Sequence, residues 1–193
     1  MPSTYIVEAP STFHELLATD ELLRTADSDR LRRFALSRLL NDTYFHNFVT
    51  HLLEAAFQRE VYTLIDNGES FDAAKLNSIK AGVLKQFWGD AVELEPGAEL
   101  TWMRQSHYYL GLYSYTYSAG LTISTQAFLN LRENREQGAK QWLDFLSLGD
   151  SVPPVEAAKV AGVDVTSDAA LHATIQFLDD TEREIEELSK KID

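Results

Sequence analysis

The stretch that decides the fold is residues 30–66, RLRRFALSRLLNDTYFHNFVTHLLEAAFQREVYTLID. Its apolar side chains recur every three or four residues, which is the spacing of one face of an α-helix. They are Leu31, Phe34, Ala35, Leu39, Phe45, Phe48, Leu52, Leu53, Ala56 and Phe57. The pattern predicts one long helix over residues 30–66, and the Asn67-Gly68 pair that follows is typical of a helix C-terminus.

Shorter helices are predicted on both sides of this stretch, at residues 9–23, 72–88, 99–103, 138–146, 155–161 and 168–190. Ser11 is the expected N-cap of the first of them. The aromatic stretch 107–131 is too long for a strand, so it predicts a buried helix despite its β-branched and aromatic residues. No segment alternates like a strand. The sequence therefore predicts an all-α protein, with residues 1–193 as a single helical domain.

The composition excludes several kinds of protein. The chain has 193 residues, of which 45% are apolar, and it has no cysteine. Disulfides and cysteine-based zinc sites are therefore excluded, and a reducing, cytoplasmic location is expected. Neither a signal peptide nor a run of 18 apolar residues is seen, so no membrane partner is expected. A net charge of −13 argues against nucleic acid as a partner.

Two carboxylates near the start are a first candidate for chemistry. Glu8 and Glu15 are seven residues apart, about two helical turns, so they can share one helix face. A pair of acids on one face is also an ordinary solvated surface, and acids near a helix start are favoured by the helix dipole. The sequence leaves both interpretations open.

A second candidate is the segment His107–Tyr117, HYYLGLYSYTY, which holds five of the eight tyrosines. Phenol rings pack as apolar groups, but each buried hydroxyl needs a hydrogen-bond partner. The segment therefore predicts either a core with satisfied hydroxyls or a wall of donors along a substrate groove. In the second case His107 could donate to a developing oxyanion.

No complete active site is found among the five histidines. His14-Glu15 is not followed by the second histidine of a His-Glu-x-x-His zinc motif. His46 and His51 are five residues apart, about 140° around a helix, so we do not expect them to share an ion. Both are interpreted as ordinary helix residues. No Ser/His/Asp or glycine-rich phosphate signature is present either.

The segments quoted so far resemble a known family. Glu8-Ala-Pro-Ser-Thr-Phe-His-Glu15 resembles the segment after the zinc-binding helix in the thimet oligopeptidase and oligoendopeptidase F family. Residues 107–120, with Trp102-x-Arg104 before them, resemble the tyrosine-rich segment of that family. Residues 148–154 and 161–164 are similar to the closing helices of oligoendopeptidase F. The three blocks stand in the family's order and span almost the whole chain.

The resemblance implies a role for each acid. It implies a zinc metalloendopeptidase that hydrolyses short peptides with a zinc-activated water. Glu8 matches the third zinc ligand, which follows the two histidines of the metal-binding helix. Glu15 matches a second carboxylate that orients a ligand histidine.

The tyrosine segment matches the substrate-binding groups of the family. His107, Tyr108, Tyr109 and Tyr115 correspond to groups that hold the peptide and stabilise the tetrahedral intermediate. Which tyrosines face the substrate stays open, because Tyr108 and Tyr115 form one helical pair and Tyr109 and Tyr113 form another.

The chain departs from the family pattern in one large respect, since it begins seven residues before Glu8 and His-Glu-x-x-His is absent. We therefore expect a C-terminal fragment that is inactive alone, with Zn²⁺ in the intact enzyme and none on this chain. Its expected partners are short peptides and the missing N-terminal half. The alternative is a non-catalytic helical protein that self-associates, or that complements a separate catalytic half, through apolar surface left uncovered.

Overall fold

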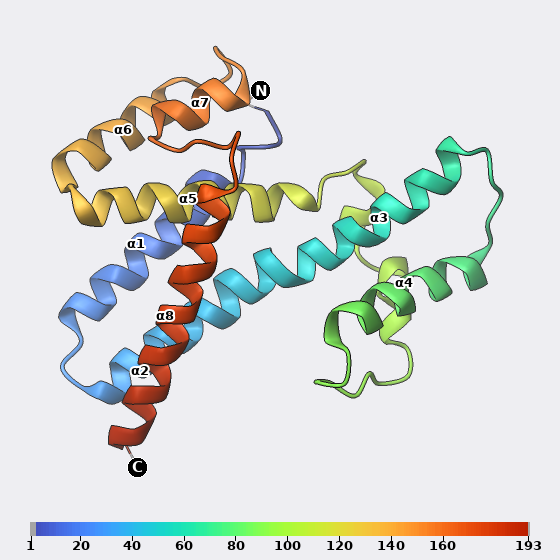
Figure 1. Ribbon diagram of the computed structural model, residues 1–193, viewed down its shortest axis with the longest axis horizontal. Helices are drawn as coiled ribbons and strands as arrows, with labels where there is room; N and C mark the ends of the chain where they lie inside the picture. Colours follow the sequence, from blue (N-terminus) through green and yellow to red (C-terminus); the bar gives the residue numbers. More distant parts are fainter. Residues whose placement is uncertain (1–2, 193) are drawn as a thin grey trace. The chain divides into compact units, whose positions relative to one another are not determined.

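The computed structural model describes residues 3–192, and these residues form helices and no strand. The all-α prediction is confirmed. The helices, in chain order (Figure 1), are α1 Ala9–Thr25, α2 Asp29–Arg38, η1 Leu39–Thr50, α3 His51–Asp66, α4 Ala73–Trp88, η2 Ala98–Met103, η3 Ser106–Tyr109, α5 Tyr115–Glu133, α6 Arg135–Ser147, α7 Pro154–Val160 and α8 Ala169–Ile192. Among the described residues, no helix is long and apolar enough to cross a membrane.

The chain divides into two compact units. The first unit takes the chain up to Phe48 and again from Thr116 onward, and the second is Val49–Tyr115. The first unit therefore holds α1, α2 and the C-terminal helices. The second holds α3 and α4 with the short 3₁₀ helices η2 and η3.

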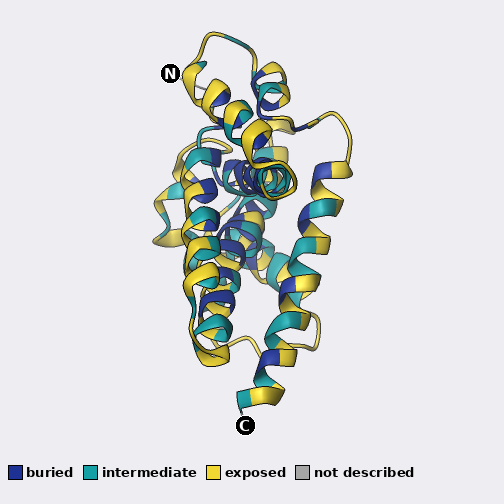
Figure 2. Ribbon diagram, turned by 90° about the vertical axis from the view of Figure 1, so that its left-hand side faces the viewer, coloured by how far each residue is buried: buried dark blue, intermediate teal, exposed yellow. Residues whose placement is uncertain are grey.

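The first unit is built around a hydrophobic core. Within it α2 packs against both α1 and α8, and in Figure 2 α8 carries only scattered buried residues among exposed ones. Phe13 of α1 stacks on Trp142 of α6, with ring centroids 3.9 Å apart. The hydroxyl of Tyr44 is satisfied inside this core by Thr125, at 2.7 Å, as buried polar groups require.

A glycine lets α5 approach the start of α1 closely. A Cβ atom added at Gly120 would lie 2.8 Å from the backbone nitrogen of Ala9 and 3.0 Å from the carbonyl carbon of Glu8. Real Cβ contacts are not that short, so only glycine fits this position. The close approach fixes the backbone that carries Glu8.

Side-chain hydrogen bonds connect the segments of the second unit. Asp72 caps α4 by accepting a 2.9 Å hydrogen bond from the backbone N–H of Lys75. The indole N–H of Trp102 in η2 donates to Asn77 of α4 at 2.8 Å. The buried amide of Gln58 on α3 donates to the carbonyl of His107 at 3.1 Å. Each bond ties an irregular segment to a helix.

The long helix predicted over residues 30–66 is confirmed, with one difference. Helix is assigned from Asp29 through Asp66, but Leu39–Thr50 is wound as a π-helix. Asn67 is the C-cap, as predicted, and Gly68 follows with φ 72°. The predicted N-cap at Ser11 is wrong, because α1 begins at Ala9 and Glu8 is its N-cap.

The single helix predicted over residues 107–131 is wrong in its first third. Only the 3₁₀ helix η3 and, from Tyr115, α5 are helical there. Between them Gly111 has φ 44° and Leu112 has φ 53°, the left-handed region that a right-handed helix cannot accommodate. The apolar pattern indicated helix, but it could not reveal this backbone reversal.

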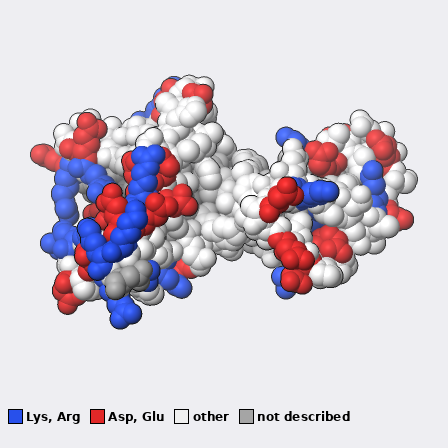
Figure 3. All heavy atoms as spheres, turned by 60° about the horizontal axis from the view of Figure 1, so that its bottom comes forward, with Lys and Arg blue, Asp and Glu red and all other residues white. Residues whose placement is uncertain are grey.

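The surface is charged but mixed in sign. On the face drawn in Figure 3, acidic and basic side chains are interspersed. Many of them are paired within the first unit, as Arg32 is with Glu184 at 3.1 Å and Arg183 with Asp179 at 2.6 Å. Exposed pairs of this kind contribute little to stability.

Candidate functional site

The two predicted carboxylates lie on α1 and its N-cap, in the first unit. Glu8 is half-buried, and its carbonyl accepts from the hydroxyls of Ser11 and Thr12, each at 3.0 Å. Glu15 is exposed at the level of the whole residue, but its carboxylate accepts a 2.5 Å hydrogen bond from the buried Thr43. The two acids are seven residues apart, which places them on the same side of the helix. These hydrogen bonds hold the backbone of Glu8 and the carboxylate of Glu15 in place.

These acids do not complete a metal site with other residues that the structure describes. Among residues 3–192, the one group of three His, Asp or Glu side chains close enough to share an ion does not include Glu8 or Glu15. Zinc sites in proteins use three or four protein ligands. Glu8 alone does not fit a zinc ion, so no catalytic step through zinc is derived from this chain.

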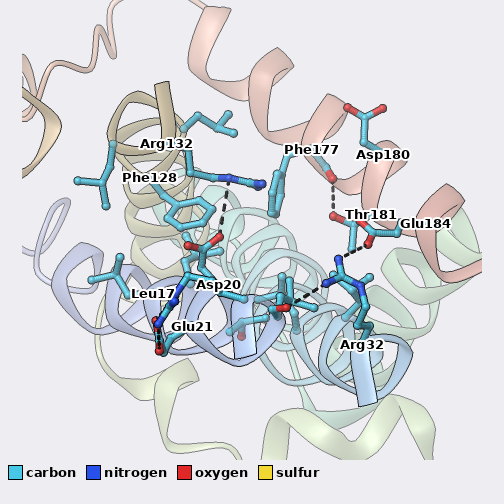
Figure 4. A pocket seen from close by; sticks show the side chains of 18 of the residues that line it. Leu17, Asp20, Glu21, Arg32, Phe128, Arg132, Phe177, Asp180, Thr181 and Glu184 are labelled. Carbon is cyan, nitrogen blue, oxygen red and sulfur yellow. Dashed lines mark hydrogen bonds and ion pairs between the residues drawn. The ribbon is translucent and has the colours of Figure 1, made fainter. Parts of the chain in front are cut away.

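The first unit also contains an open pocket of about 910 Å³, lined mostly by residues of α1, α2, α5 and α8 (Figure 4). Charged side chains in its wall are paired with one another, as Arg32 is with Glu184 at 3.1 Å and Arg132 with Asp20 at 3.8 Å. Neither predicted carboxylate lines it. The pocket is therefore not the site that the sequence indicated.

Residues 107–115 of the tyrosine segment lie in the second unit, and their tyrosines have different environments. Tyr108 is 9% exposed, whereas Tyr109 is 67% exposed and Tyr115 38%. Helical spacing does not relate Tyr108 to Tyr115, nor Tyr109 to Tyr113, because residues 110–114 are not helical. Accessibility separates these tyrosines, which the sequence could not do.

The hydroxyl of Tyr108 points to a buried lysine. Lys80 of α4 is 3% exposed, and its Nζ donates to the Tyr108 oxygen at 2.6 Å. Burial lowers the pKa of Lys80 to about 8, although the negative charge of Glu54 opposes the shift. Burial also raises the pKa of Tyr108, and Glu54 adds to that rise. The two shifts move the pKa values apart, so the proton stays on the Tyr108 hydroxyl, and its transfer to Lys80 is less favourable than between an exposed tyrosine and lysine.

Beside this pair lies a cluster that sequence analysis missed. Glu54 of α3 lies 2.7 Å from the Nδ1 of His51 and 3.8 Å from the Nδ1 of His107. The hydroxyl of Ser114 donates to the same carboxylate oxygen at 3.1 Å. His51 and Glu54 are one turn apart on the helix, a spacing that could have been noticed. His107 comes from far along the chain, and only the fold brings it there.

Comparison with known proteins places this chain in a family. The sequence model of peptidase family M3 matches residues 2–177. The chain belongs to peptidase family M3. The resemblance found in the sequence is therefore confirmed at the level of the family.

Relatives within family M3 match almost the whole chain. Oligopeptidase PepF of Bacillus subtilis is 25% identical over 190 residues, 98% of this chain and 28% of the relative. The plasmid-encoded oligoendopeptidase F of Lactococcus lactis subsp. cremoris is 26% identical over 187 residues, 97% of this chain and 31% of the relative. The chain thus spans less than a third of the length of these relatives.

A solved structure of the family has the same fold. The crystal structure of oligoendopeptidase-F from Enterococcus faecium matches with a TM-score of 0.87 and 26% identity, covering 97% of this chain and 36% of that one. The helical fold is that of a portion of an oligoendopeptidase F. The roles of Glu8, Glu15, His107 and the tyrosines stay predictions.

Proposed function

We propose that this chain is part of a zinc-dependent oligopeptidase that hydrolyses short peptides. The observation that carries the proposal is the match of nearly the whole chain to oligoendopeptidase-F in fold, together with membership of family M3. The acid pair on α1 adds support, because Glu15 is held by Thr43 and the Glu8 backbone is packed beneath Gly120. A metal site needs supporting groups that are held in place, as the carboxylate of Glu15 is here.

Each predicted residue has a role in this proposal. Glu8 would supply one carboxylate to a zinc site whose histidine ligands this chain does not contain, and Glu15 would orient one of those histidines. His107 would donate a hydrogen bond to the developing oxyanion. Tyr109 would contact the substrate, since its side chain is exposed. Tyr108 is a weaker candidate, because it is buried and its hydroxyl already accepts a hydrogen bond from Lys80.

The chain by itself is proposed to be inactive. Its 193 residues contain no His-Glu-x-x-His, so they lack both histidine ligands and the glutamate that would act as general base. Purified chain supplied with zinc should leave a quenched fluorescent peptide intact.

The sharper experiment is a chimera. The segment of the Enterococcus faecium oligoendopeptidase-F that matches this chain is replaced by it, and hydrolysis of a quenched peptide is measured. Glu8→Ala should abolish both zinc content and cleavage. Glu21→Ala, which removes an exposed carboxylate of the same helix, is the matched control and should change neither. A folded, zinc-loaded chimera that stays inactive, or one that tolerates Glu8→Ala, would contradict the proposal.

A second function is favoured by the apolar surface. Several large apolar side chains are exposed, among them Phe34 at 58% and Leu143 at 62%. Surfaces of this kind take part in association, so the chain could instead be a non-catalytic helical protein that pairs with itself or with a separate catalytic half. Light scattering over a concentration series distinguishes these functions, since a chain that stays monomeric at every concentration counts against self-association.

A further inference from the structure

The second unit contains a buried group of metal-ligand type. His51 and Glu54 are 0% and 4% exposed, and the side chain of His107 is 23% exposed. One ligand atom from each of the three lies within 4.8 Å of the other two. Two ligands of a tetrahedral zinc ion, each about 2.1 Å from the metal, are separated by about 3.4 Å. The present distances of 2.7 Å and 3.8 Å to Glu54 lie on both sides of that value.

The fold holds these groups in place from several sides. His51 and Glu54 share one face of α3, and the Ser114 hydroxyl donates to the Glu54 carboxylate at 3.1 Å. His107 is brought to the same face because Gln58, one turn beyond Glu54, donates to its carbonyl at 3.1 Å. A metal site needs this kind of support for its ligands.

The chemistry of the cluster favours a cation. The two imidazole rings meet edge to face, with centroids 4.9 Å apart, and both offer a nitrogen to one carboxylate. Two neutral imidazoles and one carboxylate form a ligand set used by zinc, which leaves a fourth position for water. The Oε1 of Gln58, one turn along α3 from Glu54, is also buried with no hydrogen-bond partner among the described residues.

We propose that His51, Glu54 and His107 bind one divalent transition-metal ion, with zinc as the probe of choice. The ligand types select zinc and its first-row neighbours over magnesium and calcium, which prefer oxygen-only sites. The side-chain amide of Gln105 lies 3.0 Å from the Nδ1 of His107. An ion bound through Nδ1 replaces that hydrogen bond, so Gln105→Ala should keep or tighten metal binding.

The test is a metal titration of the purified chain after removal of metals by a chelator. Calorimetry with Zn²⁺ should give one ion per chain with a Kd of about 1 µM or below. Co²⁺ should give the visible absorption bands of a four-coordinate nitrogen and oxygen site. Glu54→Gln, which keeps the shape of the side chain, and His107→Asn should each weaken binding by more than about 100-fold.

Control variants remove exposed histidines and the other candidate ligand. His14→Asn, His172→Asn and Glu8→Gln should each bind zinc within about twofold of the parent chain, because none of these residues belongs to the cluster. Circular dichroism checks the fold of every variant. If Glu54→Gln does not fold, His107→Asn decides, since its side chain is the most exposed of the three.

The proposal is overturned if no zinc binds up to about 1 mM, or if binding survives both cluster variants. It is also overturned if Glu8→Gln or a histidine control abolishes binding. The inference does not rest on the peptidase proposal, because the titration needs neither substrate nor activity. An inactive chimera leaves it standing, and a chain without zinc leaves the peptidase proposal standing.

Discussion

Lys80 donates a 2.6 Å hydrogen bond to the phenol oxygen of Tyr108 in the interior of the second unit. Its Nζ also lies 5.2 Å from the centre of the Tyr108 ring. Burying an ammonium group is costly unless it is paired. Tyr108, a candidate substrate-binding residue, thus accepts a hydrogen bond from Lys80, a residue that belongs to no motif in the sequence.

The first prediction concerns the stability of the protein at alkaline pH. The pKa of Lys80 is about 8 in the folded chain and near 10.5 when exposed. Between these values the unfolded chain binds a proton that the folded chain does not, so stability rises with pH across this window. The full gain is on the order of 3 kcal/mol. Burial raises the pKa values of Tyr44 and Tyr108, so from about pH 10 upward they act in the opposite direction.

Urea unfolding followed by tryptophan fluorescence at pH 7.5, 9 and 10 measures this rise. Trp88 and Trp102 report on the second unit. Lys80→Met keeps a side chain of similar length without the charge, so its unfolding midpoint should not rise between pH 8 and pH 10. Parallel pH profiles for the parent and Lys80→Met would show that Lys80 does not cause the effect.

The second prediction compares two neighbouring tyrosines. Tyr108→Phe removes the phenol oxygen that receives the Lys80 ammonium, so it should destabilise the chain by about 1–3 kcal/mol. Tyr109→Phe alters a side chain that is 67% exposed and should change stability by less than about 0.5 kcal/mol. In the chimera the order should reverse, with Tyr109→Phe raising KM more than Tyr108→Phe does. Equal effects on stability would contradict the assignment of Tyr108 to the interior.

The third prediction tests the close approach of α5 to α1. Gly120→Ala places a methyl group against the backbone of Glu8 and Ala9 and should cost about 1–3 kcal/mol. Gly82→Ala on α4 meets nothing within 4 Å and should stabilise by up to about 1 kcal/mol through helix propensity. Thermal unfolding by circular dichroism measures both. A stabilising Gly120→Ala would show that α5 does not press on the start of α1.

The fourth prediction tests the support of Glu15. Thr43→Val keeps the shape of a buried side chain but removes the hydroxyl that donates to Glu15 at 2.5 Å, and should cost about 1 kcal/mol. Thr43→Ser loses the methyl group but keeps the hydroxyl, so it is the control for a change at this position that leaves the hydrogen bond intact. In the chimera, Thr43→Val should lower kcat more than Thr43→Ser does, since Glu15 is proposed to orient a metal ligand. Equal kcat values for the two variants would argue that Glu15 has no such role.

Sequence patterns predicted the helices well where caps and periodicity agreed. Asp72 was expected to begin a helix, and its carboxylate caps α4. The pattern failed at Gly111 and Leu112, because a left-handed pair leaves no mark on the spacing of apolar residues. It also failed at Ser11, whose hydroxyl donates to the carbonyl of Glu8 instead of capping the helix start.

By itself, the sequence determined the helical class and the resemblance to family M3, since both depend on local periodicity and on residues in fixed order. It also identified Glu8, Glu15 and the tyrosine segment as candidate functional residues. Only the tertiary structure decided which polar groups meet. Lys80 reaches Tyr108, and His107 reaches Glu54, across long stretches of chain. Such contacts form because helices pack their buried faces together, and no local spacing encodes which faces will meet.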